Sequence, residues 1–336
     1  MIKEMQGPKI DLHLHLDGSL SVDIIRKLAK IQNMELDLSD DELKERLQVQ
    51  EGCKSLNEYL TKFDFPLLFL QTEEGIEESV YLLLEELLQE GMDYVEIRFA
   101  PQLHLQKGLT QLQVVESAVR GLERSKLSAS LMLCCMRGDK NHEENLETIR
   151  IASCYQHVSQ KDYYTSGYQQ ASQKEKEHLS VCAVDLAGAE ALYPTENFEE
   201  EFLLARELGV PFTIHAGEAA GPESVWKALS FGAKRIGHGV RAREDQALMT
   251  ELARRGTVLE LCPTSNLQTA IYSDIKEYPI REFLEAGIRV SINTDNRMVS
   301  DTTLEKEYAL LQEAFSLTEE ELNKIKENAV YGKFTA

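Results

Sequence analysis

The sequence predicts an α/β fold of the TIM (β/α)₈ barrel class, and three observations lead to that prediction. Eight short apolar runs alternate with amphipathic stretches of helical period along the chain. Several of these runs are almost continuously hydrophobic, which is typical of strands buried on both faces of a parallel sheet. The length of 336 residues suits one barrel with insertions, so residues 1–336 are expected to form a single domain. An open, doubly wound sheet is the alternative arrangement.

The individual elements follow from their patterns. Apolar runs predict strands at Lys9–Leu16, Tyr94–Ala100, Ala129–Met136, Val181–Ala187, Phe212–His215, Arg235–His238, Val258–Cys262 and Arg289–Thr294. Amphipathic spacing predicts helices between them, among others at Leu112–Arg124, Phe198–Leu208, Pro222–Phe231, Asp245–Arg255 and Ile280–Ala286, and a closing helix at Glu319–Val330.

Two stretches interrupt the alternation. Ser21–Gly91 contains helical patterns and no clear strand, so we expect helices inserted after the first strand and lying over the top of the barrel. Tyr155–His178 is polar and rich in tyrosine, and we expect it to extend a helix and form a loop after the third strand.

Charge and cysteine usage narrow the class of partner and the compartment. The net charge is −21, from 57 acidic and 36 basic side chains, which opposes binding to nucleic acid. Six cysteines without a CxxC pair indicate reduced thiols and a cytoplasmic location. The chain has no apolar signal core near its start and no apolar run of about 18 residues, so no membrane association is expected. Nothing in the sequence indicates an obligate protein partner.

Four residues at predicted strand ends form a candidate metal site. His13 and His15 are two apart on the first strand, so their side chains point to the same side. His215 ends the fifth strand and Asp295 follows the eighth, at the end of a barrel where catalytic residues gather. Three imidazoles and a carboxylate suit one zinc ion. A purely structural zinc site is the alternative, and iron, cobalt or manganese would fit a similar ligand set.

Two further residues indicate catalysis rather than a structural metal. Glu218 lies in a glycine-bearing turn three residues after His215, where partial burial beside a metal would let a carboxyl group carry a proton near neutral pH. His238 ends the sixth strand between two glycines, which leave room for a substrate or water. The other four histidines, His104, His142, His157 and His178, are interpreted as structural or surface residues, and Cys262 as a small buried residue.

Six motifs in this order resemble the adenosine deaminase family, within the wider group of amidohydrolase-type barrels. They are DLHLHLDGSL (11–20), YVEIRFAP (94–101), DLAG (185–188), HAGEAAGPESVW (215–226), RIGHGV (235–240) and SINTD (291–295). Together they extend over nearly the whole chain. The resemblance implies a hydrolase that deaminates adenosine, and 2′-deoxyadenosine as well, to inosine and ammonia in purine salvage, with a zinc-activated water attacking purine C6.

The resemblance also assigns roles to individual positions. It implies that His13, His15, His215 and Asp295 bind the zinc ion, that Glu218 protonates purine N1, and that His238 and Asp295 hold the attacking water. Implied substrate contacts are His15, Asp17 at a ribose hydroxyl, Gly188 at purine N3, Asn296 at purine N7, and an apolar lid of Tyr59, Leu60 and Phe63.

Two positions depart from the family pattern. Asn296 stands where many members have a second aspartate, and its amide can donate directly to neutral N7. Ala189 stands where DLAGDE is frequent, so an acidic side chain is missing there. The alternatives to an adenosine deaminase are an adenine deaminase, whose relatives tend to have glutamate at position 17, a deaminase of AMP or modified adenosine, and a catalytically silent nucleoside-binding protein.

Overall fold

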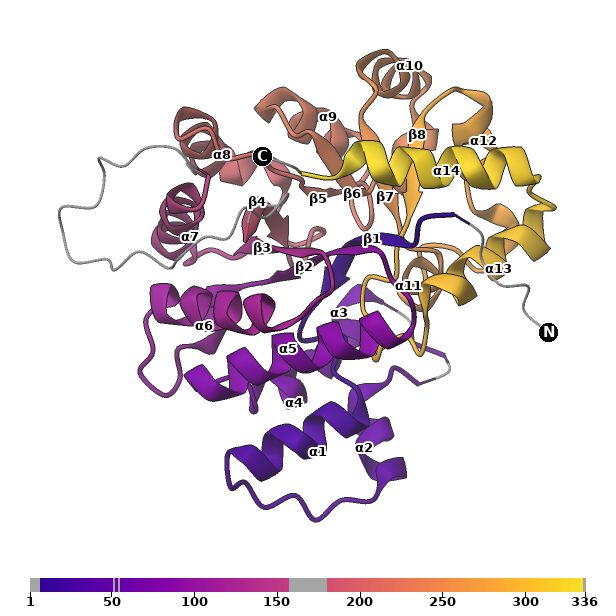
Figure 1. Ribbon diagram of the computed structural model, residues 1–336. Coiled ribbons are helices and arrows are strands. Elements are labelled where there is room, and N and C mark those ends of the chain that lie inside the picture. Colours follow the sequence, from indigo (N-terminus) through magenta and orange to yellow (C-terminus); the bar gives the residue numbers. More distant parts are fainter. Residues whose placement is uncertain (1–6, 51, 54, 157–179, 335–336) are drawn as a thin grey trace.

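The computed structural model describes residues 7–50, 52–53, 55–156 and 180–334, and these form an α/β barrel (Figure 1). Its parallel strands form two runs of four neighbours, β1-β2-β3-β4 and β5-β6-β7-β8. The strands are β1 (Ile10–His15), β2 (Tyr94–Phe99), β3 (Ala129–Met136), β4 (Val181–Ala187), β5 (His215–Ala216), β6 (Arg235–His238), β7 (Val258–Leu261) and β8 (Arg289–Ile292).

Backbone hydrogen bonds join the two runs of strands at both seams. At one seam the His15 amide donates to the Asp295 carbonyl (2.7 Å), and the Asp295 amide donates to His13 (2.8 Å). At the other seam the Thr213 amide donates to the Val184 carbonyl (3.1 Å), next to a parallel bridge between Val184 and Phe212. The sheet therefore closes on itself, which confirms the predicted barrel and excludes the open sheet.

The fifth strand differs from its prediction. Regular pairing is confined to His215–Ala216, although Phe212–His215 was expected. The hydrogen bonds to the β6 side advance by three residues there against two on this segment, so the register shifts by one residue and the regular ladder is interrupted. The segment still lies in the barrel wall, because Phe212 and Ile214 accept backbone hydrogen bonds from Lys234 and Gly237 of the β6 side.

Helices surround the barrel and extend beyond it. They are α1 (Val22–Ile31), α2 (Asp40–Leu47), α3 (Leu56–Leu60), α4 (Asp64–Leu67), α5 (Glu73–Gln89), α6 (Gln111–Arg124), α7 (His142–Cys154), α8 (Glu199–Glu207), α9 (Pro222–Phe231), α10 (Gln246–Arg255), α11 (Pro263–Gln268), α12 (Ile280–Glu285), α13 (Leu304–Phe315) and α14 (Glu319–Gly332). None of the helices in the described ranges is both long and apolar enough to cross a membrane.

The inserted helices after β1 are α1 to α4, which lie in the lower part of Figure 1. The last helix of the expected insertion, α5, is instead a barrel helix that leads into β2 and packs beside α6. Its buried Ile76, Val80, Leu83 and Leu87 recur at helical spacing and form the face that covers the sheet. The loop expected over Tyr155–His178 lies outside the described residues, apart from a turn at Tyr155 and Gln156.

The C-terminal helix α14 covers the amino end of the barrel. Ile10 and Tyr94, which begin β1 and β2, pack with Ala329 of α14. Arg235 Nη1 donates a hydrogen bond to the carbonyl of Gly332 at 2.7 Å. Gly332 packs closely on β1, since a Cβ added to Gly332 would lie 3.0 Å from the Leu12 side chain. This end is therefore closed, which leaves the carboxyl end for the site.

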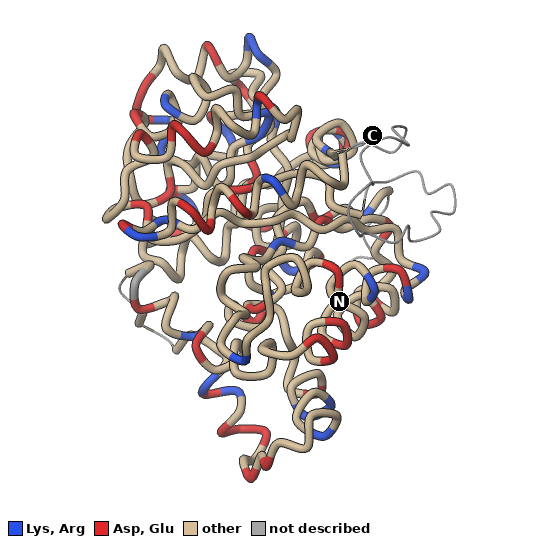
Figure 2. Tube along the Cα trace, turned by 90° about the vertical axis from the view of Figure 1, so that its left-hand side faces the viewer, with Lys and Arg blue, Asp and Glu red and all other residues tan. Residues whose placement is uncertain are grey.

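Charged side chains are spread along the outer helices rather than gathered in one area. Figure 2 shows acidic positions interleaved with basic ones over the side of the molecule that it presents. Arg120 and Arg124 of α6, for example, lie 2.9 Å and 3.0 Å from Glu77 of α5. Such exposed ion pairs contribute little to the free energy of unfolding. The effect expected of the acidic excess is on solubility, because molecules of high like charge repel one another.

Candidate metal centre and active site

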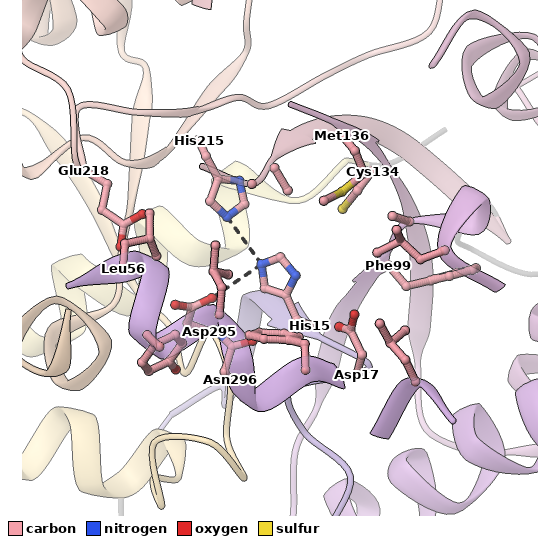
Figure 3. Close-up of a pocket in the computed structure, with 18 of the residues that line it drawn as sticks. His15, Asp17, Leu56, Phe99, Cys134, Met136, His215, Glu218, Asp295 and Asn296 are labelled. Carbon is pink, nitrogen blue, oxygen red and sulfur yellow. Dashed lines mark hydrogen bonds and ion pairs between the residues drawn. The ribbon is translucent and has the colours of Figure 1, made fainter. Parts of the chain in front are cut away.

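Three histidines and one aspartate meet at the carboxyl end of the barrel. His13 and His15 share one side of β1, His215 opens β5, and Asp295 follows β8. His15 Nε2 lies 3.3 Å from His215 Nε2, and Asp295 Oδ1 lies 3.4 Å from Nε2 of both His13 and His15. One ligand atom from each residue falls within 4.8 Å of the others. Figure 3 shows three of the four, His15, His215 and Asp295, with their side chains close together. The structure thus brings together all four expected metal ligands.

The unpartnered nitrogens of this cluster fit a cation. Nδ1 of His13 lies 2.8 Å from Glu260 Oε2, and Nδ1 of His215 lies 2.8 Å from Asp185 Oδ2. A carboxylate at Nδ1 favours the tautomer with hydrogen on Nδ1, which leaves the Nε2 lone pair free to bind a metal. Nε2 of His13 is buried and has no hydrogen-bond partner. The imidazole Nε2 lone pairs and the Asp295 carboxylate lie 3.3–3.4 Å apart and repel one another unless a positive charge lies between them. This set of donor atoms therefore fits a divalent metal ion.

The two supporting carboxylates are themselves fixed by buried arginines. Arg98 donates to Asp185 and to Glu260, both at 2.9 Å, and Arg235 donates to Glu260 at 2.6 Å. Burial opposes ionisation of Glu260, but Arg98 and Arg235 outweigh it and hold the pKa of its carboxyl well below the usual range. The groups behind the metal cluster are therefore charged and locked in place.

A second combination of nearby groups, His13, His238, Cys262 and Asp295, is a weaker metal site. Burial raises the pKa of the Cys262 thiol well above its usual value, and only a thiolate binds metal strongly. Nδ1 of His238 is already engaged by Asn266 at 3.1 Å. The first combination is therefore preferred, and Cys262 is a buried small residue, as the sequence indicated.

Glu218 lies at the side of the metal cluster, on the turn that follows β5. Gly217 adopts a positive φ of 69°, which lets the chain reverse and directs the Glu218 side chain into the site. Glu218 as a whole is 4% exposed. Burial, the charge of Asp295 and the charge of Glu190 all raise the pKa of Glu218 well above its usual value. These surroundings favour the protonated acid at neutral pH.

His238 faces Glu218 from the end of β6. Its Nε2 lies 3.7 Å from Glu218 Oε2, and the side chain is 1% exposed. Both His238 and Asp295 have a φ of 59°, in the left-handed region that residues other than glycine rarely adopt. Such conformations concentrate at functional sites, where the surrounding structure holds them.

Asn266 of α11 connects these two residues, and the sequence analysis did not identify it. Its Nδ2 lies 3.1 Å from Nδ1 of His238 and 3.4 Å from Oε1 of Glu218, while its Oδ1 accepts a hydrogen bond from Tyr278 (3.1 Å). A donor at Nδ1 leaves the hydrogen of neutral His238 on Nε2, facing the site. The available signal was the position of CPTSN directly after the seventh strand, where a polar side chain enters the barrel mouth.

A cavity of about 280 Å³ opens beside the metal cluster. All the residues expected to contact substrate line it, namely His15, Asp17, Tyr59, Leu60, Phe63, Gly188 and Asn296. The lid residues come from α3 and the short 3-10 helix Thr61–Phe63. The cavity is also lined by Cys134, Met136, Phe99, Leu56 and Asp64, to which no pattern in the sequence pointed.

Two polar atoms in this cavity region are buried without a partner. They are Oδ1 of Asp17 and Oδ1 of Asn296. Burial raises the pKa of Asp17 to about 6. Buried polar atoms are nearly always hydrogen-bonded, so the Asp17 oxygen points to a polar ligand in the cavity. Asn296 Oδ1 instead lies against Gly18, where a Cβ would come within 2.1 Å of it.

Two of the four histidines interpreted as structural or surface residues are described by the structure, and both lie away from the site. His104 is buried with its Nδ1 3.0 Å from the Leu70 carbonyl, and His142 of α7 lies 3.0 Å from Glu201. His157 and His178 lie outside the described residues.

Known proteins similar to this chain share its length and its fold. The family model described as adenosine deaminase matches residues 8–336. An adenosine deaminase of Haemophilus ducreyi is 46% identical over 331 residues, which are 97% of this chain and 91% of that protein.

Two solved structures share the fold. An adenine deaminase from Arthrobacter aurescens has a TM-score of 0.82 at 23% identity, covering 98% of this chain and 95% of its own. An amidohydrolase from Burkholderia ambifaria with bound Zn has a TM-score of 0.81 at 19% identity, covering 98% of this chain and 86% of its own. With the family match over nearly its full length and the 46% identical relative, the chain belongs to the adenosine deaminase family.

Proposed function

We propose that Glu218 and His238, beside a metal ion held by His13, His15, His215 and Asp295, carry out the hydrolytic deamination of adenosine, the reaction of this chain's family. One observation carries the assignment of roles. The buried Glu218 carboxyl and the His238 ring face each other at the edge of both the four-ligand cluster and the cavity.

We propose zinc as the metal, since three imidazoles and a carboxylate are borderline-soft ligands. Zinc supplies a water of lowered pKa, so that hydroxide is available near pH 7. Asp185 and Glu260 would keep the ligating rings of His215 and His13 oriented. The choice of zinc is supported by the four ligating residues and by the carboxylates of Asp185 and Glu260 behind two of them.

The chain's own residues then activate the purine. An aromatic ring resists addition of water at C6 unless N1 gains a proton, and the protonated carboxyl of Glu218 is the acid that supplies it. His238 would orient the water and stabilise the charge that develops on its oxygen, with hydrogen on Nε2 because Asn266 occupies Nδ1. Of the two protons of the added water, one ends on the departing amino group, which leaves C6 as ammonia, and the other restores the Glu218 acid. Inosine, which keeps the hydrogen on N1, is the product.

Contacts along the cavity would orient the nucleoside. We assign the Gly188 backbone to N3, the Asn296 amide to N7 and Asp17 to a ribose hydroxyl. The unpartnered oxygen of Asp17 supports its assignment, because a hydroxyl group can donate to it. The lid of Tyr59, Leu60 and Phe63 would exclude bulk water from the closed site.

The lining of the cavity supports a nucleoside over a nucleotide. Among the described residues that line it none is Lys or Arg, whereas Asp17 and Asp64 are both there. A 5′-phosphate would meet these carboxylates without a compensating cation, which disfavours AMP. Asp17 also favours a ribose-bearing substrate over free adenine. Deoxyadenosine keeps most contacts and is a second proposed substrate.

A substrate panel tests these assignments. Initial rates with adenosine, deoxyadenosine, adenine and AMP are compared on one sample whose metal content is measured. We expect adenosine and deoxyadenosine to be deaminated far faster than the other two, with about one zinc ion per chain, and chelation to abolish ammonia release. A higher rate with adenine or AMP would contradict the substrate assignment, and activity without any bound metal would contradict the metal site.

Two further properties stay proposals. We infer that the chain works as a single catalytic domain, which the family match over residues 8–336 supports. We also propose a cytoplasmic location, which six free cysteines support because reduced thiols persist there. Cell fractionation checks the location, and recovery of the protein from an oxidising compartment would contradict it.

A further inference from the structure

The carboxylate of Glu190 holds the turn that carries Glu218. Its two oxygens accept hydrogen bonds from four consecutive backbone amides, Gly217 (2.7 Å), Glu218 (3.0 Å), Ala219 (2.7 Å) and Ala220 (2.9 Å). The side chain is 1% exposed. Four successive N–H groups of a turn have no partner in a strand or helix, so this one carboxylate satisfies donors that would otherwise be buried and unpaired.

A polar network continues from this carboxylate to the metal cluster. Ser224 of α9 donates to Glu190 Oε1 at 2.5 Å, and the Ser224 and Thr195 hydroxyls lie 2.7 Å apart. Arg137 donates to Thr195 at 3.0 Å and to the carbonyl of His215 at 2.6 Å. The turn is therefore held on both sides, by Glu190 at its amides and by Arg137 at the residue that begins β5.

We propose that Glu190 is a positioning residue for deamination, which fixes the Gly217–Ala220 turn and thereby the place of the Glu218 carboxyl relative to the purine ring. The proposal rests on the proposed role of Glu218 as the acid. Glu190 touches no reacting atom and acts through the backbone of its neighbours.

The same segment contains the departure at position 189. Gly188 lines the cavity, Ala189 is partly exposed, and Glu190 points inward to the turn. The segment that follows β4 thus provides both the proposed contact to purine N3 and the anchor of the acid. A carboxylate at 190 supplies the anchoring, whatever side chain stands at 189.

Glu190→Gln tests the proposal, with Glu201→Gln as a matched control. Glutamine keeps one acceptor oxygen but turns an NH₂ group toward backbone N–H groups, so the turn loses part of its anchor. Glu201 is equally buried, at 2% exposure, and pairs with His142 away from the site. A displacement of a reacting group by about 1 Å can cost about 10²-fold in rate. We expect kcat to fall by about that factor in Glu190→Gln, with much smaller changes in KM and with unchanged metal content.

The control separates positioning from general destabilisation. If Glu190→Gln and Glu201→Gln lower the melting temperature similarly but only the former lowers kcat, the proposal holds. Parental kcat in folded Glu190→Gln overturns it. Where Glu190→Gln does not fold, Ser224→Ala removes only the hydroxyl contact, and we expect about a tenfold loss of kcat. Parental kcat in that variant then overturns the proposal.

Chemical rescue gives a second, independent measurement. In Glu190→Ala, added formate can occupy the space left by the side chain and accept the same amide hydrogens, and it should restore part of kcat. Chloride at equal ionic strength should not do so. Failure of formate to raise kcat in folded Glu190→Ala counts against the proposal. Glu218→Gln measured alongside distinguishes the two failures, since parental activity there would refute the assignment of the acid itself.

Discussion

Replacing Glu218 by glutamine removes one proton from the site and little else. Glutamine has the same length, and its oxygen can still accept the hydrogen bond from Asn266 that Glu218 Oε1 accepts at 3.4 Å. Its NH₂ group can still donate a hydrogen bond to purine N1, but it cannot transfer a proton. Binding of adenosine should therefore be largely kept while turnover is lost.

The expected size of the loss follows from what a general acid contributes. Proton transfer by a positioned side chain is worth about 10²–10⁴-fold in rate, which corresponds to about 3 to 5 kcal/mol in the activation barrier. We place the effect in this range or above, because Glu218 is buried and water cannot easily replace its carboxyl as the donor.

The stability of this variant should change in the opposite direction. The pKa of Glu218 is raised in the folded protein by burial first and then by Asp295 and Glu190. A raised carboxyl pKa lowers the free energy of unfolding as the pH rises from about 4.3 through the folded pKa, and the loss is complete above it. Glutamine removes this loss, so at neutral pH the variant should be at least as stable as the parent.

The assay combines kcat and KM for adenosine, metal content and thermal unfolding. Glu223→Gln is the control, since Glu223 lies on the same segment, is exposed and accepts only a local hydrogen bond from Gly221. We expect the control to keep parental kcat. Turnover by Glu218→Gln at the parental rate, with metal bound, would refute the assignment of Glu218 as the acid.

Three further predictions follow from the same contacts. Glu260→Gln should lower metal affinity by about 10–100-fold by loosening His13, as measured by chelator competition, and unchanged affinity would contradict this role. Asn266→Ala should lower kcat about tenfold and shift the hydrogen of His238 between its ring nitrogens, which ¹⁵N spectra of the labelled imidazole detect; an unchanged tautomer and kcat would contradict it. The rate should fall as the pH rises through the raised pKa of Glu218, because only the protonated form donates, and a pH–rate profile with no alkaline decline counts against this.

The metal side of the site could be predicted from the sequence because its residues stand at strand ends. A buried strand has a fixed direction and a side-chain period of two, so His13 and His15 must point to the same side. The closed barrel then brings the end of β8 next to β1, and with it Asp295. Local patterns and one topological rule are sufficient here.

The supporting residues could not be found in the same way. Glu190 lies in a turn and Asn266 in a short helix. The nearest backbone partner of Glu190, Gly217, is 27 residues away in the chain, and the site partners of Asn266, His238 and Glu218, are 28 and 48 residues away. Neither position has a periodic pattern, and what each side chain contacts depends on how the loops fold against one another. For the same reason, the sequence did not distinguish the barrel helix α5 from the inserted helices. All of them have amphipathic spacing, and only the packing of α5 beside α6 shows that it belongs to the barrel.

The two sides of the site also differ in how their buried charges are balanced. On the metal side, burial opposes ionisation of Asp185, but His215 and Arg98 outweigh it and hold the pKa of its carboxyl well below the usual range. On the acid side, Glu190 satisfies backbone amides and adds a negative charge beside Glu218, and the pKa of Glu218 is raised. One barrel mouth thus contains carboxylates that stay ionised to orient metal ligands and a carboxyl that stays protonated to act as an acid. Because the difference arises from the neighbours and not from the residue type, exchanging Glu190 for a neutral side chain should both loosen the position of Glu218 and lower the pKa of its carboxyl, so that less of it is protonated at neutral pH.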